Sequence, residues 1–92
     1  MAKSMMSKQT AHDIADRLLL HILADEELLS SLLGRSGLNP SQLAEVVNGP
    51  GIHEFVLEFV SESDDRVMAC ADAIGARPDD IALASRMLSR RD

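Results

Sequence analysis

Aromatic residues are scarce in this chain of 92 residues, which has no tryptophan, no tyrosine and two phenylalanines, Phe55 and Phe59. A core must therefore be built from aliphatic side chains, and the hydrophobic fraction of 46% is large enough for one. A chain of this length buries roughly 60–70% of the surface that its unfolded form exposes. We therefore expect one small domain that folds alone.

Basic residues are also in short supply. Nine lysines and arginines are set against 15 aspartates and glutamates, so the formal net charge at neutral pH is −6. Nucleic acids and anionic membranes attract proteins through a positive field, so this charge balance argues against both as partners. An acidic surface is typical of a cytoplasmic protein, because molecules that carry the same charge repel one another and stay in solution.

The chain has one cysteine and no long apolar run. An intrachain disulfide is impossible because Cys70 is alone, which favours a reducing compartment. The run Leu18-Leu19-Leu20 is broken by His21 and is far shorter than the ~20 residues of a membrane-spanning helix. The first residues lack the apolar run of a signal peptide. These features predict a cytoplasmic protein without a membrane partner.

Apolar residues recur at helical spacing along most of the chain. The pattern predicts six short helices, the first at about 10–23 and the fourth at about 50–61. Residues typical of helix starts introduce the other four, namely Asp25, Asn39 with Pro40, Ser63 and Pro78. We expect a flexible tail at 1–9 and a single all-α domain at 10–92.

Three positions refine the expected packing. Leu20 widens the apolar face of the first helix, which predicts that this helix is buried on more than one side. Met68 is expected to face inward from the fifth helix. Gly34 lies inside the second helix and costs up to ~1 kcal/mol relative to alanine, unless a neighbouring backbone needs the space.

One helix–turn–helix pattern occurs twice. A helix stop at Gly37 and a helix start at Pro40 recur 38 residues later, at Gly75 and Pro78. We therefore expect a compact domain of two related three-helix units, at about 10–49 and 50–90, packed face to face. The alternative is that evenly spaced helix stops produce this echo by chance.

Three stretches of the chain carry a family resemblance. They are Leu23-Ala24-Asp25-Glu26-Glu27-Leu28-Leu29, Ser36-Gly37-Leu38-Asn39-Pro40 and Val56-Leu57-Glu58-Phe59-Val60. From about residue 14 to residue 88 the chain resembles a bacterial family of small helical proteins called domain of unknown function 3572. The resemblance implies an all-helical cytoplasmic protein. Because the family name states no activity, the resemblance implies no catalytic residues.

Three histidines are the candidates for acid–base chemistry at neutral pH: His12, His21 and His53. No two of them have the four-residue spacing of a helical metal site. A site assembled across helices stays open at this stage. Cys70 lies between two alanines and is interpreted as a core residue rather than a reactive thiol. We therefore predict no catalytic residues, no cofactor and no metal ligands.

Acidic pairs occur at three predicted helix starts, namely Glu26-Glu27, Asp64-Asp65 and Asp79-Asp80. They lack the alternating ligands of a calcium-binding loop. Negative charge is favourable at the positive end of a helix dipole, so we interpret these pairs as helix-capping residues.

Phe55 and Phe59 lie four residues apart on the fourth helix, and their counterparts in the first half are Arg17 and His21. We interpret the two phenylalanines as filling the seam between the halves. The alternative is a partly exposed face for a partner, including a second copy of this chain. The leading hypothesis is a small cytoplasmic adaptor that binds another protein and has no catalytic activity.

The alternative function is DNA binding. Ala71, Gly75 and Ile81 have the spacing of a helix-turn-helix, in which the last helix would enter the DNA groove. The arginines that would meet phosphates are Arg77, Arg86, Arg90 and Arg91. Asp79 and Asp80 would occupy the turn that should meet the bases, and the net charge also opposes DNA.

Overall fold

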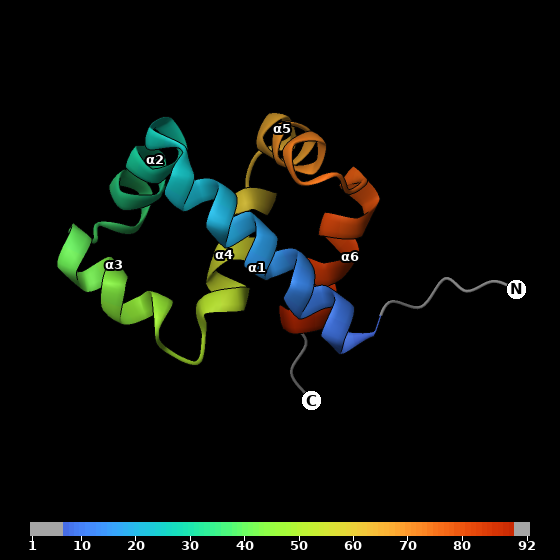
Figure 1. Cartoon of the computed structure of the whole chain (residues 1–92), viewed down its shortest axis with the longest axis horizontal. Coiled ribbons are helices and arrows are strands. Elements are labelled where there is room, and N and C mark those ends of the chain that lie inside the picture. Colours follow the sequence, from blue (N-terminus) through green and yellow to red (C-terminus); the bar gives the residue numbers. More distant parts are fainter. Residues whose placement is uncertain (1–6, 90–92) are drawn as a thin grey trace, which may run out of the picture.

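The computed structural model describes residues 7–89, which form six α-helices joined by short turns (Figure 1). The helices are α1 (Lys8–Ala24), α2 (Glu26–Ser36), α3 (Pro40–Val47), α4 (Ile52–Ser61), α5 (Asp64–Ile74) and α6 (Pro78–Ser89). Residues 7–89 contain no strand, so the prediction of a small all-α domain is confirmed. Arg90, Arg91 and the first six residues of the predicted tail lie outside the described residues.

The residues that the sequence predicts as helix caps make the expected capping hydrogen bonds. The Asp25 carboxylate accepts hydrogen bonds from the backbone N–H groups of Glu27 and Leu28 at 3.0 and 3.1 Å. Asn39 and Gln42 form a reciprocal capping box at the start of α3. The two predicted helix stops are also confirmed, because Gly37 and Gly75 both have a φ of 74°, a conformation that favours glycine.

Two predicted helix starts are wrong. α1 begins at Lys8 because the Ser7 hydroxyl accepts a hydrogen bond from the Thr10 N–H at 3.1 Å, so residues 7–9 belong to the helix and its cap. α4 begins at Ile52 instead of residue 50 because Pro50 and Gly51 form a turn before it. Gly51 caps α4 without a side-chain hydrogen bond.

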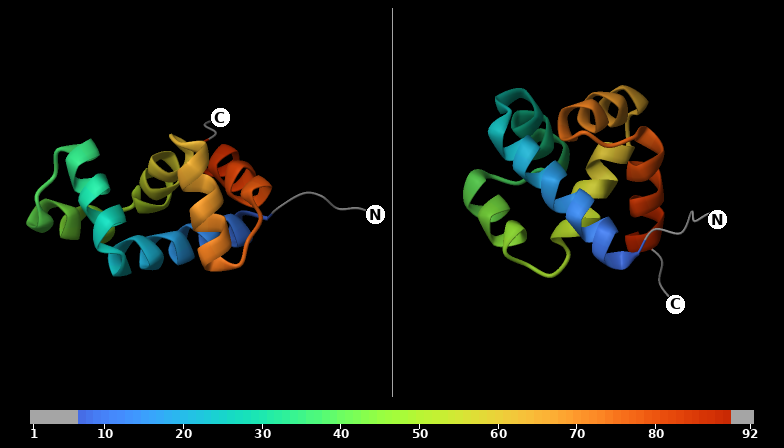
Figure 2. Two further views of the ribbon diagram at one scale, coloured as in Figure 1. Left: turned by 90° about the horizontal axis from the view of Figure 1, so that it is seen from above. Right: turned by 45° about the vertical axis from the view of Figure 1, so that its right-hand side comes forward.

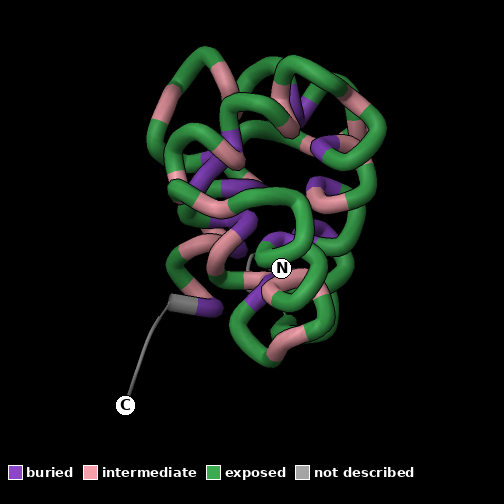
Figure 3. The backbone as a smooth tube through the Cα atoms, turned by 90° about the vertical axis from the view of Figure 1, so that its left-hand side faces the viewer, coloured by how far each residue is buried: buried purple, intermediate pink, exposed green. Residues whose placement is uncertain are grey.

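The core lies where α1 packs on α4 and α6 and where α5 covers their ends. α1 contributes the buried residues Ala11, Ile14, Ala15, Leu18 and Ile22. In Figure 3 the buried positions, in purple, lie on the inner sides of the helices, and the outer turns are green. α2 joins this core through Leu32, whose side chain is 1% exposed.

Two predicted core positions and one neighbouring leucine are at the surface. Leu20 and Met68 are 67% and 61% exposed, and Leu23 is 40% exposed. The prediction that α1 is buried on more than one side is therefore wrong. Its neighbours cover one stripe, and the opposite side with Leu20 faces solvent.

The internal repeat is present in the helix boundaries. α2 and α5 begin and end 38 residues apart, and so do the first residues of α3 and α6. The packing differs between the halves, because α6 lies against α1, α4 and α5, whereas the backbone of α3 approaches other helices at few points. α3 lies at the end of the molecule opposite α5 and α6 (Figure 2). The first half therefore leaves one side of α3 uncovered.

Candidate functional site

Two of the three candidate histidines meet between α1 and α4. The ring centroids of His12 and His53 are 4.6 Å apart, and His53 Nε2 lies 2.7 Å from Asp16 Oδ1. His21 is half-buried further along α1. Across residues 7–89, no group of three or more His, Cys, Asp or Glu side chains is arranged to hold a metal ion. The described contacts make this cluster a link between two helices.

Cys70 lies in the core and is fully buried. Burial raises the pKa of its thiol, an effect that nearby Arg66 opposes and Asp25 reinforces. The protonated thiol is therefore favoured, and a thiolate nucleophile is not. The interpretation of Cys70 as a core residue is confirmed.

The acidic pairs lie in the first turns of α2, α5 and α6, as expected for residues that interact with the helix dipole. At α6 the Asp80 carboxylate accepts a hydrogen bond from the Arg77 N–H at 3.2 Å. This bond offsets the weak capping ability of arginine at that position. The face of α6 that buries Ile81 and Ala84 is turned to the core, while Asp79 is exposed.

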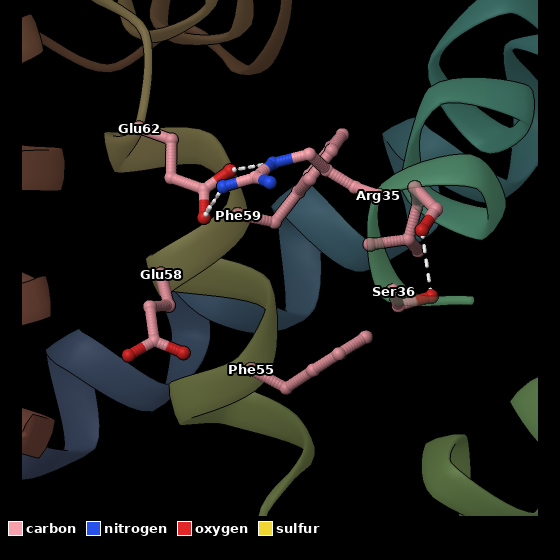
Figure 4. A pocket seen from close by; sticks show the side chains of 7 residues that line it. Arg35, Ser36, Phe55, Glu58, Phe59 and Glu62 are labelled. Atoms are coloured by element: carbon pink, nitrogen blue, oxygen red, sulfur yellow. Dashed lines mark hydrogen bonds and ion pairs between the residues drawn. The ribbon is translucent and has the colours of Figure 1, made fainter. Parts of the chain in front are cut away.

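Phe55 and Phe59 lie at the seam between the two halves. Phe59 is 4% exposed, with the Arg66 guanidinium 4.1 Å from its ring centroid, and Phe55 is half-buried. Both line a pocket of about 200 Å³ between α2 and α4 (Figure 4). This volume is below the range of about 300–1,000 Å³ usual for ligand pockets. The interpretation of the pair as seam residues is confirmed for Phe59.

An ion pair closes this seam at one end. The Arg35 guanidinium of α2 donates from Nε to Glu62 Oε1 at 2.7 Å, and its Nη2 lies 2.6 Å from Glu62 Oε2 (Figure 4). This two-point contact is the strongest geometry available to an arginine and a carboxylate. The hydrogen bond between the two side chains raises the pKa of Arg35 and lowers the pKa of Glu62, and the charge of each partner adds a smaller effect in the same direction. The contact ties α2 to the end of α4.

A larger apolar groove of about 380 Å³ lies between the end of α1, α2 and α3, and we call it the α1–α3 groove. Its lining residues are Leu23, Leu29, Leu33, Pro40, Leu43, Ala44, Val47 and Asn48. The one polar side chain is that of Asn48, whose amide already donates to the Ala44 carbonyl at 2.9 Å. The groove therefore offers an occupant apolar contact more than hydrogen bonds.

Exposed apolar surface continues from the groove along α1. Leu20 precedes Leu23 by one turn, so the two side chains are neighbours on the helix surface. They are two of the three large hydrophobic residues that are exposed within residues 7–89, and Met68 on α5 is the third. An apolar surface that gathers around a concave groove is typical of a protein-binding site.

One acidic side chain, Glu26, lies beside the α2 residues that line the groove. Glu26 precedes Leu29 and Leu33 by three and seven residues, which places it on the same side of α2. Asp16 precedes Leu20 and Leu23 by four and seven residues, but its carboxylate is paired with His53 on α4. The groove thus has an apolar floor with one neighbouring carboxylate.

The sequence did not reveal this groove. Helical periodicity identifies apolar faces but does not say which neighbour covers each of them. The available signal was the excess of leucines around Leu20 and Leu23, which exceeds what one packed face of α1 can bury. Because Leu20 was interpreted as a buried residue, the exposed apolar surface around it was not predicted.

Comparison with known proteins gives one family. The family model described as "Protein of unknown function (DUF3572)" matches residues 8–91. The curated proteins and the solved structures gave no match. Within the described residues, no helix is long and apolar enough to cross a membrane. Because the match covers nearly the whole chain, as the resemblance of the three stretches predicts, the chain belongs to the DUF3572 family.

Proposed function

We propose that the chain is a small cytoplasmic protein-interaction domain that works as an adaptor without catalytic activity, and that its binding surface is the α1–α3 groove. The observation that carries this proposal is the groove itself, in which seven of the eight lining residues are apolar and the eighth has a partner for its amide. Adjacent Leu20 extends the apolar surface beyond the groove. Surfaces of this kind support protein binding because burying them releases water.

The alternative function, DNA binding through α6, remains a prediction that the described residues do not favour. Asp79 is exposed in the first turn of α6, and this is the turn with which a recognition helix would contact bases. Its core-facing side is already used against α1 and α4.

A comparison of baits tests the proposed surface. Full-length chain and a Leu20→Gln/Leu23→Gln variant are immobilised and exposed to native lysate, with Met68→Gln as the control. All three changes replace an exposed apolar side chain by a neutral polar one. The proposal predicts a protein retained by the wild type and by Met68→Gln and lost from the double variant. Identical protein sets on all three baits contradict it.

A further inference from the structure

The segment of residues 26–47, which contains α2 and α3, is loosely attached to the rest of the fold. α5 and α6 each pack against α1, against α4 and against each other. Within residues 7–89, α2 packs closely on α1 alone, and α3 approaches its neighbours at few points. Leu32 and Leu43 are the two buried side chains of residues 26–47, whereas α4 by itself buries five. Segments with few buried apolar contacts open at a lower free energy than the core beside them.

The contact between this segment and α4 contains a cavity. Leu32 of α2 lines the pocket of about 200 Å³ together with Phe55 and Phe59, which extend from α4 toward α2 (Figure 4). Side chains that border an empty space lack dispersion contacts on that side, so this interface is weaker than a close-packed one. Phe59 is 4% exposed, and separation of α2 from α4 would uncover its ring.

One polar contact fastens the segment to the far side of this cavity. Within residues 7–89, the contact of Arg35 with Glu62 is the one side-chain hydrogen bond or ion pair that joins residues 26–47 to the end of α4, to α5 or to α6. Glu62 also has Arg66 within reach, with Nη1 3.9 Å from its Oε1. Glu62 therefore keeps a charged neighbour when Arg35 moves away, and both partners are accessible to water, so their separation strands no buried charge.

The surface beneath the segment is held in place by α5. Arg66 donates from Nη1 to the Phe59 carbonyl at 2.7 Å, and its guanidinium lies 4.1 Å from the Phe59 ring centroid. This cation–π contact fixes the ring from the side that faces away from α2. Phe59 therefore keeps its position on α4 whether α2 is in contact with it or not.

Short turns join the segment to the other helices at both ends. Asp25 is the single residue between α1 and α2, and residues 48–51 separate α3 from α4. Residues at the ends of helices absorb the backbone rotations of hinged motions. α2 and α3 lie together at one end of the molecule, so a rotation about these two turns moves both without disturbing the remaining helices (Figure 1).

We propose that residues 26–47 are a lid that opens as one unit about the turns at Asp25 and at residues 48–51 and uncovers Phe55 and Phe59. The ion pair of Arg35 and Glu62 is its latch. The open state presents an aromatic face of α4 that the closed state hides. The motion needs no partner, so it is independent of the binding proposed for the α1–α3 groove.

Amide hydrogen exchange of the full-length protein, followed by mass spectrometry, measures the opening directly. Amides in the middle of α2 and α3 are expected to exchange at least about tenfold faster than those in the middle of α4 and α6. Because the lid opens as one unit, the interior amides of α2 and α3 are expected to show the same protection from exchange.

A matched pair of arginine variants tests the latch. Arg35→Gln removes the ion pair with Glu62, and Arg17→Gln changes an exposed arginine of α1. Arg35→Gln is expected to speed exchange about two- to fivefold in both α2 and α3 and to leave α5 unchanged, whereas Arg17→Gln changes none of them. α3 is the decisive helix, because the latch lies on α2 and α3 responds only when the two helices move together.

Salt gives a second measurement of the same latch. Screening weakens an exposed ion pair, so added salt is expected to speed exchange of the lid in the wild type. The same salt is expected to have little effect on the lid of Arg35→Gln, which has no ion pair to screen.

Three results overturn the inference. They are exchange in α2 as slow as in α4, an effect of Arg35→Gln that is confined to the last turn of α2, and equal acceleration of α2, α3 and α5. The second result would mean that the end of one helix frays. The third would mean that the whole domain unfolds.

Discussion

Leu32 is the residue that fixes α2 to the core. Its side chain is 1% exposed, whereas Leu28, Leu29 and Leu33 on the same helix are half-buried. Leu32→Ala is expected to lower the free energy of unfolding by about 2–5 kcal/mol, because the deletion leaves a cavity. Leu20→Ala, at a position 67% exposed, is expected to change it by less than about 0.5 kcal/mol. Urea denaturation measures both, and equal costs would contradict the assigned burial.

Gly34 is a position where alanine would suit the helix better than glycine does. A Cβ atom built on Gly34 meets nothing within 4 Å, so no neighbouring backbone needs the space. Gly34→Ala is therefore expected to raise the free energy of unfolding by about 0.5–1 kcal/mol. Thermal unfolding followed by circular dichroism checks this stabilisation.

Gly37, at the end of the same helix, is expected to respond to alanine in the opposite way. Its φ of 74° is unfavourable for alanine, although the space around it is also open. Gly37→Ala is expected to lower the free energy of unfolding by about 1–2 kcal/mol. A stabilising Gly37→Ala would show that α2 does not end in the left-handed conformation.

At the scale of the elements, α2 is tied to α4 by the ion pair between Arg35 and Glu62. The pKa of Glu62 is lowered in the folded chain. The carboxylate therefore stabilises the fold at pH values above the ordinary glutamate pKa of about 4.3, and this contribution is lost as the pH falls through the lowered value. Because both side chains are accessible to water, the effect is modest.

Glu62→Gln tests this pH dependence. The variant is expected to melt at a lower temperature than the wild type at neutral pH and at the same temperature in strongly acidic solution. Glu58→Gln is the control, since Glu58 is exposed one turn earlier on α4 and lines the same pocket. A difference in melting temperature that persists unchanged into acid would mean that the ion pair does not form in solution.

Helix ends were predictable because their signals are local. Asp25, Asn39 and Ser63 each cap the helix that directly follows, and the two αL glycines each end one. The start of α4 was misplaced because Pro50 suits both a turn and a first helical position. Such ambiguity is resolved by the surrounding packing, which the local sequence does not encode.

At the scale of the whole molecule, the repeated helices do not produce repeated packing. The longer α6 packs on α1, α4 and α5, whereas α3 is shorter and buries Leu43 alone. A sequence repeat reports which helices form, but contacts between distant helices decide how they are arranged. For this reason the all-α domain was predictable, and the α1–α3 groove was not.

The central claim is that the α1–α3 groove contacts another protein. A photo-crosslinking amino acid placed at position 44, inside the groove, or at position 69, outside it, tests this claim in living host cells. The account predicts a covalent adduct with another protein from position 44 and none from position 69. No adduct from position 44, or the same adduct from both positions, would contradict it.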